Sequence, residues 1–273
     1  MTKIIQLFIL SLLLAAAPAL RADVLVLVHG YLGDANSWER SGINEILDQN
    51  GWKRAGLFIG SPIGPQLFVR DYGKAENKVY VANLPSETPV IVQTEILNEI
   101  LDQVQQRHPE EDIILAGHSA GGLIARAALV KQPRKKVTML ITIASPHLGT
   151  YRAAQALNIT RSQGPFELVK RFVGGNDYVA LKHSRVLMID LLPTLPGNYI
   201  NWLNVQTHPA INYVSVIRTN PAGLAGDSLV PGYSQDMNNV PALRGKSAIY
   251  TTPTGHYLVP DDAFTLLDIL GSR

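Results

Sequence analysis

The sequence predicts an α/β protein whose mostly parallel sheet carries helices on both faces, with a cap or lid inserted between two of its strands. Three observations predict this architecture. Apolar runs rich in valine and isoleucine alternate with stretches of helical periodicity, as expected where crossover helices connect buried parallel strands. A glycine-rich turn at residues 117–122 joins one such run to a helical stretch. The strand pattern then stops between residues 151 and 209 and resumes afterwards, which marks the insertion.

The first predicted strand is the apolar run at residues 24–28, which ends in the segment His-Gly-Tyr-Leu-Gly at 29–33. A helical stripe follows at 43–47, and Gly51 is expected to end that helix. Residues 52–78 have no clear period, because glycine, proline and aromatic residues recur irregularly. They predict an irregular excursion with a small hairpin.

The later elements follow the same alternation of strand and helix. Thr88 is expected to cap a helix that has Pro89 at its first position, and Asp261 to cap the closing helix. Within the insertion, helices are expected at 151–157 and 167–172. The other predicted elements are strands at 79–82, 113–116, 137–143, 213–217 and 247–252, and helices that bury apolar residues at 96–104, 123–130 and 264–270.

Composition excludes several classes of function. The net charge is +2, with 24 basic and 22 acidic residues, so nothing points to a nucleic-acid partner. The absence of cysteine excludes thiol catalysis, disulfides and thiolate metal sites. No motif calls for a cofactor or a metal, and the length suits one large α/β domain.

The first 22 residues predict a secretory signal peptide. Lys3 supplies the positive charge, residues 4–17 are almost wholly apolar, and small residues follow. The apolar run falls short of the roughly 20 residues that a membrane-spanning helix needs, which favours cleavage over an uncleaved anchor. Cleavage is expected after Ala22, with Ala19 as the alternative. Residues 23–273 would then form the mature domain, in a secreted or periplasmic protein.

The glycine-rich turn has the context of a nucleophile elbow, a tight strand-to-helix turn that exposes a serine. Its sequence, Gly-His-Ser-Ala-Gly-Gly at 117–122, fits the pattern G-x-S-x-G between a strand and a helix. Small residues are required because the positions two before and two after the serine come close together. The following helix directs its N-terminal N–H groups at the serine and favours negative charge there. This context favours Ser119 as a nucleophile over an ordinary glycine-rich turn.

A serine nucleophile needs a base beside it, which a carboxylate orients. His256 is the last histidine and lies in the loop after the last predicted strand, at the sheet edge where the elbow opens. The acid should precede it, and Asp227 in a Gly-Asp-Ser loop is the first candidate. Asp236 and Asp190 remain alternatives.

Acyl transfer also needs donors that stabilise an oxyanion. The backbone N–H of Ala120, directly after the nucleophile, is one candidate. The second is the N–H of Tyr31, in the loop after the first strand, where Gly30 allows a close turn. In the same region His29 is expected to be a structural hydrogen-bonding group, and His108 is expected to lie at a solvated helix end.

Taken together, these motifs resemble the α/β-hydrolase family and, within it, the bacterial lipases and esterases. The resemblance covers nearly all of the mature chain, and the motifs occur in the family's order. The segments that carry it are 24–33 (VLVLVHGYLG), 117–121 (GHSAG), 144–150 (ASPHLGT), 226–231 (GDSLVP) and 255–256 (GH).

The resemblance implies hydrolysis of carboxylic esters by a triad of Ser119, Asp227 and His256, with Tyr31 and Ala120 as oxyanion donors. It also implies an α/β-hydrolase fold with a lid over residues 151–209. The expected partner is an ester or lipid substrate, with transient contact at a membrane or lipid interface. Thioesterase and acyltransferase activities on lipid acyl groups need the same residues and stay open, as do a serine peptidase and a non-catalytic binding module.

Two further expectations concern the inserted segment and metal binding. Apolar clusters at 166–173 and 187–192 are expected to line a pocket for an acyl chain, against the alternative of a helical layer that only covers the sheet. Some secreted lipases of this kind bind calcium near the acid and the histidine. Asp261 and Asp262 follow His256 at roughly the position of such calcium ligands. No matching second ligand is present in the sequence, so no metal is expected.

Overall fold

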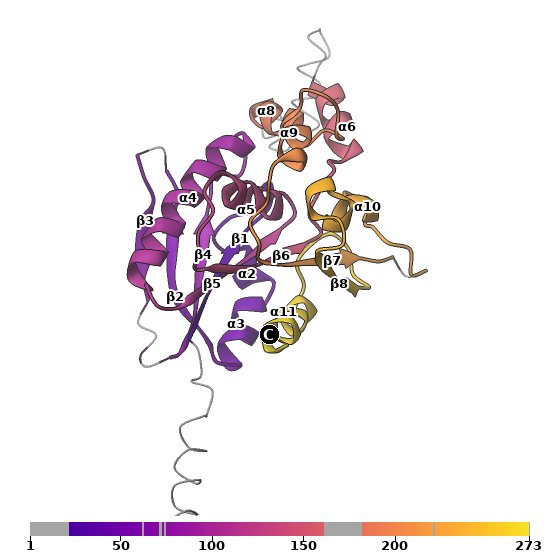
Figure 1. The fold of residues 1–273 in the computed structure, drawn as a ribbon. Helices are drawn as coiled ribbons and strands as arrows, with labels where there is room; N and C mark the ends of the chain where they lie inside the picture. Colours follow the sequence, from indigo (N-terminus) through magenta and orange to yellow (C-terminus); the bar gives the residue numbers. More distant parts are fainter. Residues whose placement is uncertain are drawn as a thin grey trace, which may run out of the picture.

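An eight-stranded sheet forms the centre of the computed structural model, which describes residues 22–61, 63–70, 73, 75–160, 182–220 and 222–272 (Figure 1). Its strand order is β3-β2-β4-β1-β5-β6-β7-β8. Neighbouring strands are parallel except for β2 and β3, which are antiparallel. The strands are β1 (Asp23–Val28), β2 (Trp52–Ile59), β3 (Gln66–Val69), β4 (Asn77–Asn83), β5 (Asp112–His118), β6 (Val137–Ile143), β7 (Asn212–Arg218) and β8 (Ser247–Thr252).

The strands that the apolar runs predict are all present. Every residue of β1 and of β5 is buried, as expected for central parallel strands covered on both faces. The segment 52–78 holds the predicted hairpin, which β2 and β3 form, but the sequence did not predict that β2 also pairs with β4 in the parallel sheet. A register shift between Arg54 and Gly56 interrupts the pairing of β2 with β4. This bulge removes the regular alternation by which a strand is recognised.

Helices cover both faces of the sheet, as predicted. In Figure 1, α4 and α5 lie on one side, and α3 and α11 lie on the other. Two apolar clusters fill the spaces between the layers, one beneath α4 and α5 and the other beneath α3 and α11. The helices are α2 (Ser37–Arg40), α3 (Ile43–Gln49), α4 (Val90–Arg107), α5 (Ala120–Lys131), α6 (Tyr151–Thr160), α8 (Arg185–Asp190), α9 (Tyr199–Val205), α10 (Gly232–Gln235) and α11 (Asp261–Gly271), with 3₁₀ turns η1 (Met237–Asn239) and η2 (Pro241–Leu243).

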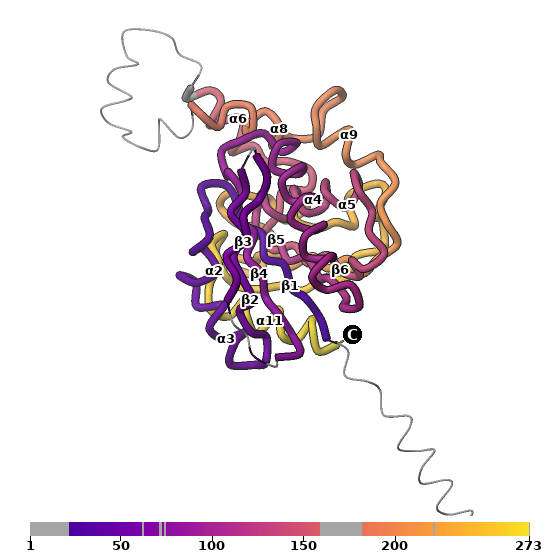
Figure 2. The backbone as a smooth tube through the Cα atoms, turned by 90° about the vertical axis from the view of Figure 1, so that its left-hand side faces the viewer, coloured from indigo at the N-terminus to yellow at the C-terminus, as the bar shows by residue number. Residues whose placement is uncertain are grey.

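The inserted segment contributes α6, α8 and α9, which gather at one end of the molecule in both views (Figures 1 and 2). No strand interrupts 182–209, as expected, and helix α6 begins where the first inserted helix was predicted. Leu187, Met188 and Leu191 are buried in the cluster beneath α4 and α5. The predicted helix at 167–172 and the apolar cluster at 166–173 lie outside the described residues. The role of 151–209 as a lid stays a prediction.

Three local predictions about helix ends are wrong. Helix α4 begins at Val90, whose N–H donates to Asp190 Oδ2 at 2.9 Å, so a distant carboxylate caps it in place of Thr88. Pro260 occupies the N-cap of α11, because the closing helix already includes Asp261. His108 is buried, and its Nε2 lies 2.9 Å from the Tyr80 hydroxyl. A tertiary partner determines the first and third cases, which a local pattern does not reveal.

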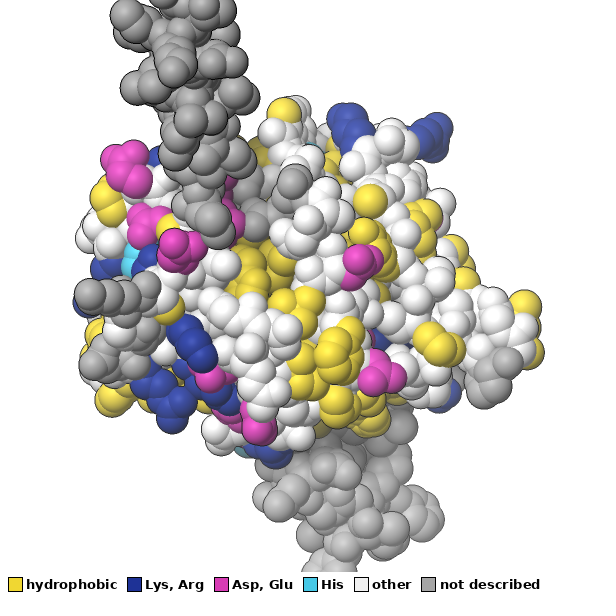
Figure 3. Space-filling model, turned by 90° about the horizontal axis from the view of Figure 1, so that it is seen from below, with side chains coloured by type: hydrophobic (Ala, Val, Ile, Leu, Met, Phe, Trp, Pro, Cys, Tyr) yellow, Lys and Arg dark blue, Asp and Glu magenta, His cyan; other side chains and the backbone are white. Residues whose placement is uncertain are grey.

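Among the described residues, no helix combines the length and the apolar character that crossing a membrane requires. On the face seen in Figure 3, Lys and Arg are interspersed with Asp and Glu, and hydrophobic side chains gather between them. Basic side chains therefore do not dominate this face.

Candidate functional site

Ser119 lies at the turn between β5 and α5 with φ 53° and ψ −128°, a backbone conformation that is unfavourable for a residue with a side chain. Its N–H donates to the Ile143 carbonyl at 2.8 Å, which ties the turn to the end of β6. A Cβ on Gly30 would lie 2.8 Å from Ser119 Cβ, so the loop after β1 passes directly beside the serine and needs glycine there. The strained turn has the geometry of a nucleophile elbow.

The structure brings Ser119, His256 and Asp227 into one chain of contacts. His256 Nε2 lies 2.9 Å from Ser119 Oγ, and His256 Nδ1 lies 2.9 Å from Asp227 Oδ2. The side chains of the histidine and the aspartate are almost fully buried. Since a carboxylate only accepts, Nδ1 carries a proton in this contact, which leaves the Nε2 lone pair facing the serine hydroxyl. This arrangement can withdraw a proton from Ser119.

Asp227 is held as a carboxylate by its surroundings. Its Oδ1 accepts from the N–H groups of Leu229 and Val230 at 2.7 and 2.8 Å, and its Oδ2 accepts from Gln235 Nε2 at 2.9 Å. Burial alone raises the pKa of Asp227, but the hydrogen bonds from His256 and the two backbone groups outweigh it and lower the pKa below its ordinary value. The ionised acid can therefore orient His256 and stabilise its positive charge.

The alternative acids have other roles. Asp236 Oδ1 accepts from the N–H of Asn238 and caps η1, and Asp190 caps α4. His256 has its hydrogen-bonded carboxylate in Asp227. His29 behaves as predicted: its Nε2 accepts from the Leu84 N–H at 3.0 Å, so it links the loop after β1 to the end of β4.

Sequence reasoning missed the role of His118, the residue before the serine. Its Nε2–H donates to the backbone carbonyl of His256 at 2.8 Å, and the two rings lie 5.2 Å apart. Burial and, to a smaller extent, the neighbouring His256 lower the pKa of His118 to about 3. His118 is therefore neutral and fixes the loop that carries His256. Its place inside the elbow was the signal that could have indicated this contact.

The low pKa of His118 predicts acid sensitivity. Below about pH 6.5 the unfolded chain takes up a proton at this residue that the folded protein excludes. The free energy of unfolding should therefore fall as the pH drops from 6.5 towards 3, by up to about 1.4 kcal/mol per pH unit from this group. The variant His118→Gln keeps a donor but cannot titrate, so urea denaturation at several pH values should show a shallower slope. The exposed His183→Gln is the control, and equal slopes for both variants would refute the prediction.

A buried ion pair holds the loop that carries His256. Arg218 Nη1 and Nη2 contact the two carboxylate oxygens of Asp262 at 2.5 and 2.9 Å, and both side chains are fully buried. Arg218 Nη2 also donates to the carbonyl of Tyr257 at 3.2 Å, next to His256. Asp262, which was considered above as a calcium ligand, thus forms an ion pair with Arg218 through both of its carboxylate oxygens.

Removing one partner of this pair should destabilise the fold. Arg218→Met leaves Asp262 as an unpaired buried carboxylate, which should lower the free energy of unfolding by about 3–5 kcal/mol in chemical denaturation. Arg40→Met, which breaks an exposed pair with Asp34, should cost below about 1 kcal/mol. The double variant Arg218→Met with Asp262→Leu should recover much of the loss. A double variant as unstable as Arg218→Met alone would show that the ion pair is not the cause.

The predicted oxyanion donors belong to residues near the serine. Ala120 is the first residue of α5, and Tyr31 follows the glycine that touches the elbow. A cavity of about 520 Å³ opens over Ser119 and His256. Its walls come from the loop after β1, from α2 and its C-terminal end, and from the acid and histidine loops. The lining residues include Gly30, Tyr31, Leu32, Ser37, Arg40, Ser41, Leu229, Tyr257 and Leu258.

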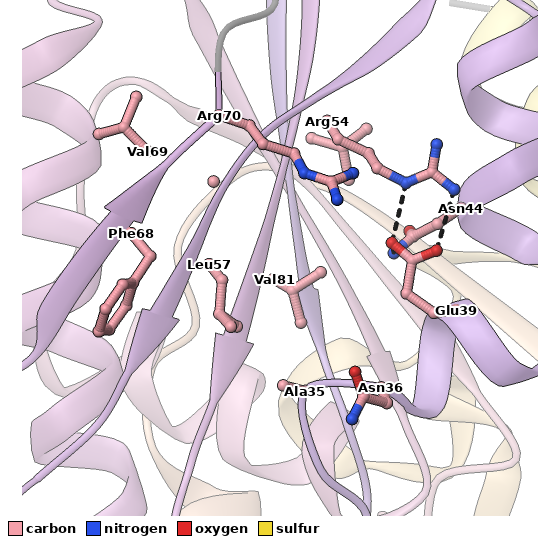
Figure 4. Close-up of a pocket in the computed structure, with 12 residues that line it drawn as sticks. Ala35, Asn36, Glu39, Asn44, Arg54, Leu57, Phe68, Val69, Arg70 and Val81 are labelled. Atoms are coloured by element: carbon pink, nitrogen blue, oxygen red, sulfur yellow. Dashed lines mark hydrogen bonds and ion pairs between the residues drawn. The ribbon is translucent and has the colours of Figure 1, made fainter.

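A second cavity, of about 360 Å³, lies elsewhere on the sheet and has no nucleophile beside a base (Figure 4). Leu57 and Val81 form its floor, and Arg54 at its rim is held by two hydrogen bonds to Glu39. Of the two cavities, only the one over Ser119 contains groups suited to acyl transfer.

Solved structures share this fold over nearly the whole chain. A gene product of Listeria innocua is 13% identical with a TM-score of 0.64, and the match covers 92% of this chain and 95% of that one. The mature lipase BlEst2 of Bacillus licheniformis is 15% identical with a TM-score of 0.56, over 93% and 94% of the two chains. Identities this low establish the fold alone.

Sequence comparison is more specific. The lysosomal thioesterase PPT2 homolog of Drosophila melanogaster is 41% identical over 59 residues, which are 22% of this chain and 20% of that protein. The match thus spans about a fifth of the length of this curated relative. The family model described as the PGAP1-like alpha/beta domain matches residues 20–170, more than half of the chain. The chain belongs to this PGAP1-like alpha/beta domain family and has the α/β-hydrolase fold of lipases and esterases.

Proposed function

We propose that the protein is a serine hydrolase that cleaves carboxylic esters through an acyl-enzyme intermediate on Ser119. The observation that carries the proposal is the continuous contact from Asp227 through His256 to Ser119 at the strained turn. A buried histidine that faces a serine hydroxyl with one nitrogen and a carboxylate with the other makes that hydroxyl nucleophilic. The cavity over Ser119 gives a substrate access to it.

In the proposed reaction, Ser119 Oγ attacks the ester carbonyl while its proton passes to His256 Nε2. The backbone N–H groups of Tyr31 and Ala120 stabilise the oxyanion that forms. The protonated histidine then gives its proton to the leaving alcohol, and the acyl group remains on Ser119. Water attacks this intermediate in the second half, with His256 again accepting and returning a proton.

The cavity also bears on the class of substrate. Leu229, Tyr257 and Leu258 provide apolar walls beside Ser119, whereas Ser37 and Arg40 lie on the wall formed by α2. Such a cavity suits an acyl chain joined to a polar group. A thioesterase is the second candidate, because the 59-residue likeness is to a thioesterase homolog and the same residues cleave a thioester.

Hydrolysis of p-nitrophenyl esters of graded chain length tests this function, together with acyl-CoA thioesters of the same acyl groups. Ester hydrolysis should exceed thioester hydrolysis in kcat/KM, and both should disappear in Ser119→Ala. A reversed preference would favour the thioesterase. No turnover of any ester or thioester would favour a binding module.

We further propose that the chain is exported after cleavage behind Ala22, directly before β1 begins at Asp23. Mass spectrometry of the protein from the periplasm or medium should then give Asp23 as the mature N-terminus. Intact Met1 in a cytosolic fraction would contradict this.

The segment 151–209 is proposed to act as the cap of the site.

A further inference from the structure

Gln235, the last residue of α10, is a buried side chain whose amide makes three hydrogen bonds. Its Oε1 accepts from the backbone N–H of Arg218 at 2.8 Å. Its Nε2 donates to Asp227 Oδ2 at 2.9 Å and to the Val230 carbonyl at 2.8 Å. The reversed amide would place its oxygen against two acceptors and its nitrogen against a donor. The partners therefore fix the orientation of the amide.

The bond from Gln235 completes the set of donors around the Asp227 carboxylate. Two backbone N–H groups occupy Oδ1, whereas Oδ2 accepts from both Gln235 Nε2 and His256 Nδ1. A carboxylate has about four acceptor positions, and these donors fill them. Because Gln235 reaches the same oxygen as the histidine, it is placed to fix the direction in which Oδ2 points.

Gln235 is itself anchored at the end of the sheet. Arg218 is the last residue of β7; its N–H holds the Gln235 amide, and its guanidinium donates to the Tyr257 carbonyl. One residue of the sheet thus holds both the acid and the loop that carries the base. Ser234, which precedes Gln235, adds a second anchor, because its Oγ donates to the Gly149 carbonyl at 2.7 Å. A side chain held in this way can orient a neighbouring group precisely.

We propose that Gln235 is a positioning residue of the triad: its amide fixes the Asp227 oxygen that faces His256. A fixed Oδ2 keeps the proton of His256 on Nδ1, so that Nε2 can accept the proton of Ser119. Gln235 is not among the described residues that line the cavity over Ser119, so it acts through the acid and not on the substrate. The inference rests on the proposed function, because it assigns a role within the same triad.

Gln235→Met removes the donor at similar volume. It should lower kcat on p-nitrophenyl butyrate by about 100-fold at nearly unchanged KM, because the acid loses its orientation while the cavity is kept. Asn238→Leu is the matched control. The Asn238 amide bridges the N–H and the carbonyl of Ser247 at 3.0 and 2.9 Å, and none of its described hydrogen bonds reaches the triad. Both substitutions should lower Tm, but only Gln235→Met should lower kcat.

Gln235→Glu provides a readout that a purely structural role would not change. A protonated carboxyl can still donate to Asp227 Oδ2, whereas an ionised one cannot and adds like charge. Burial and the Asp227 carboxylate should raise the pKa of the introduced group. The Arg218 guanidinium is paired with Asp262 and so is not free to neutralise it. The ratio of kcat/KM in the variant to that in the wild type should therefore fall at least about tenfold between about pH 6 and pH 9.

The wild type, Ser119→Ala as background and Asp227→Asn are measured in the same assay. Asn238→Asp, which introduces a carboxyl away from the triad, should keep a constant ratio across this pH range. Wild-type kcat in Gln235→Met, with Asp227→Asn strongly impaired, would overturn the positioning role and leave the proposed function intact. A constant ratio for Gln235→Glu would also overturn it, and this result decides if Gln235→Met fails to fold. If the wild type itself turns over no ester, the proposed function fails and the positioning role fails with it.

Discussion

Ser119→Ala is expected to lower kcat on p-nitrophenyl esters by about 10⁶ while leaving residual catalysis from the oxyanion donors. The reason is that, among the residues that the structure describes, no other hydroxyl has both a strained elbow and a base: His256 Nε2 lies 2.9 Å from Ser119 Oγ. Because alanine removes only the nucleophile, KM and the melting temperature should change little. Steady-state kinetics and thermal unfolding on the same preparations measure both.

Ser41→Ala is the matched control for this variant. Ser41 lines the same cavity, but its hydroxyl donates to the Trp38 carbonyl and has no histidine beside it. Its kcat should stay within a few fold of the wild type. A loss in Ser41→Ala comparable to that in Ser119→Ala would mean that the variants disturb the cavity rather than the chemistry.

Asp227→Asn is expected to lower kcat by about 10⁴. An amide in place of the carboxylate can donate to His256 Nδ1, which favours the tautomer with the proton on Nε2. That tautomer cannot accept the serine proton. In this orientation the amide NH2 also faces Gln235 Nε2, which now donates to the carboxylate at 2.9 Å, while Oδ1 can still accept from the N–H groups of Leu229 and Val230. A pH profile of kcat/KM with and without the substitution would show the loss at every pH.

Asp236→Asn separates this role from a general effect of acidic loop residues. Asp236 caps η1 by accepting from the Asn238 N–H, and asparagine is an equally good cap, so kcat should be nearly unchanged. If Asp236→Asn loses activity and Asp227→Asn keeps it, the identity of the acid is wrong although a serine–histidine pair is retained.

Most of the sheet could be predicted from the sequence because buried parallel strands are continuous apolar runs. Strands β1, β5 and β6 are clear cases, since they are flanked by turn and helix signals. The pairing of strand β2 with β4 could not be predicted, because charged residues at the start of β2 and the bulge near Gly56 obscure its pattern. Local patterns thus predict regular central strands and miss irregular strands near the sheet edge.

The candidate site divides in the same way. Chain order and loop position predicted Ser119, Asp227 and His256 as site residues. The structure places these three in contact, and their catalytic roles stay predictions. The residues that hold them were not predictable, because their partners are distant in sequence. His118 binds a carbonyl 138 residues away, and Arg218 pairs with Asp262 across 44 residues. Only the folded chain reveals such contacts.

Labelling with a fluorophosphonate, followed by peptide mapping, tests the central claim most directly, because the probe reacts with a serine that a base activates. The wild type should carry one adduct, on the peptide that contains Ser119, and His256→Ala should lose most of the labelling rate. An adduct on Ser145 or Ser228, or labelling of Ser119 at the same rate without His256, would contradict the proposed site.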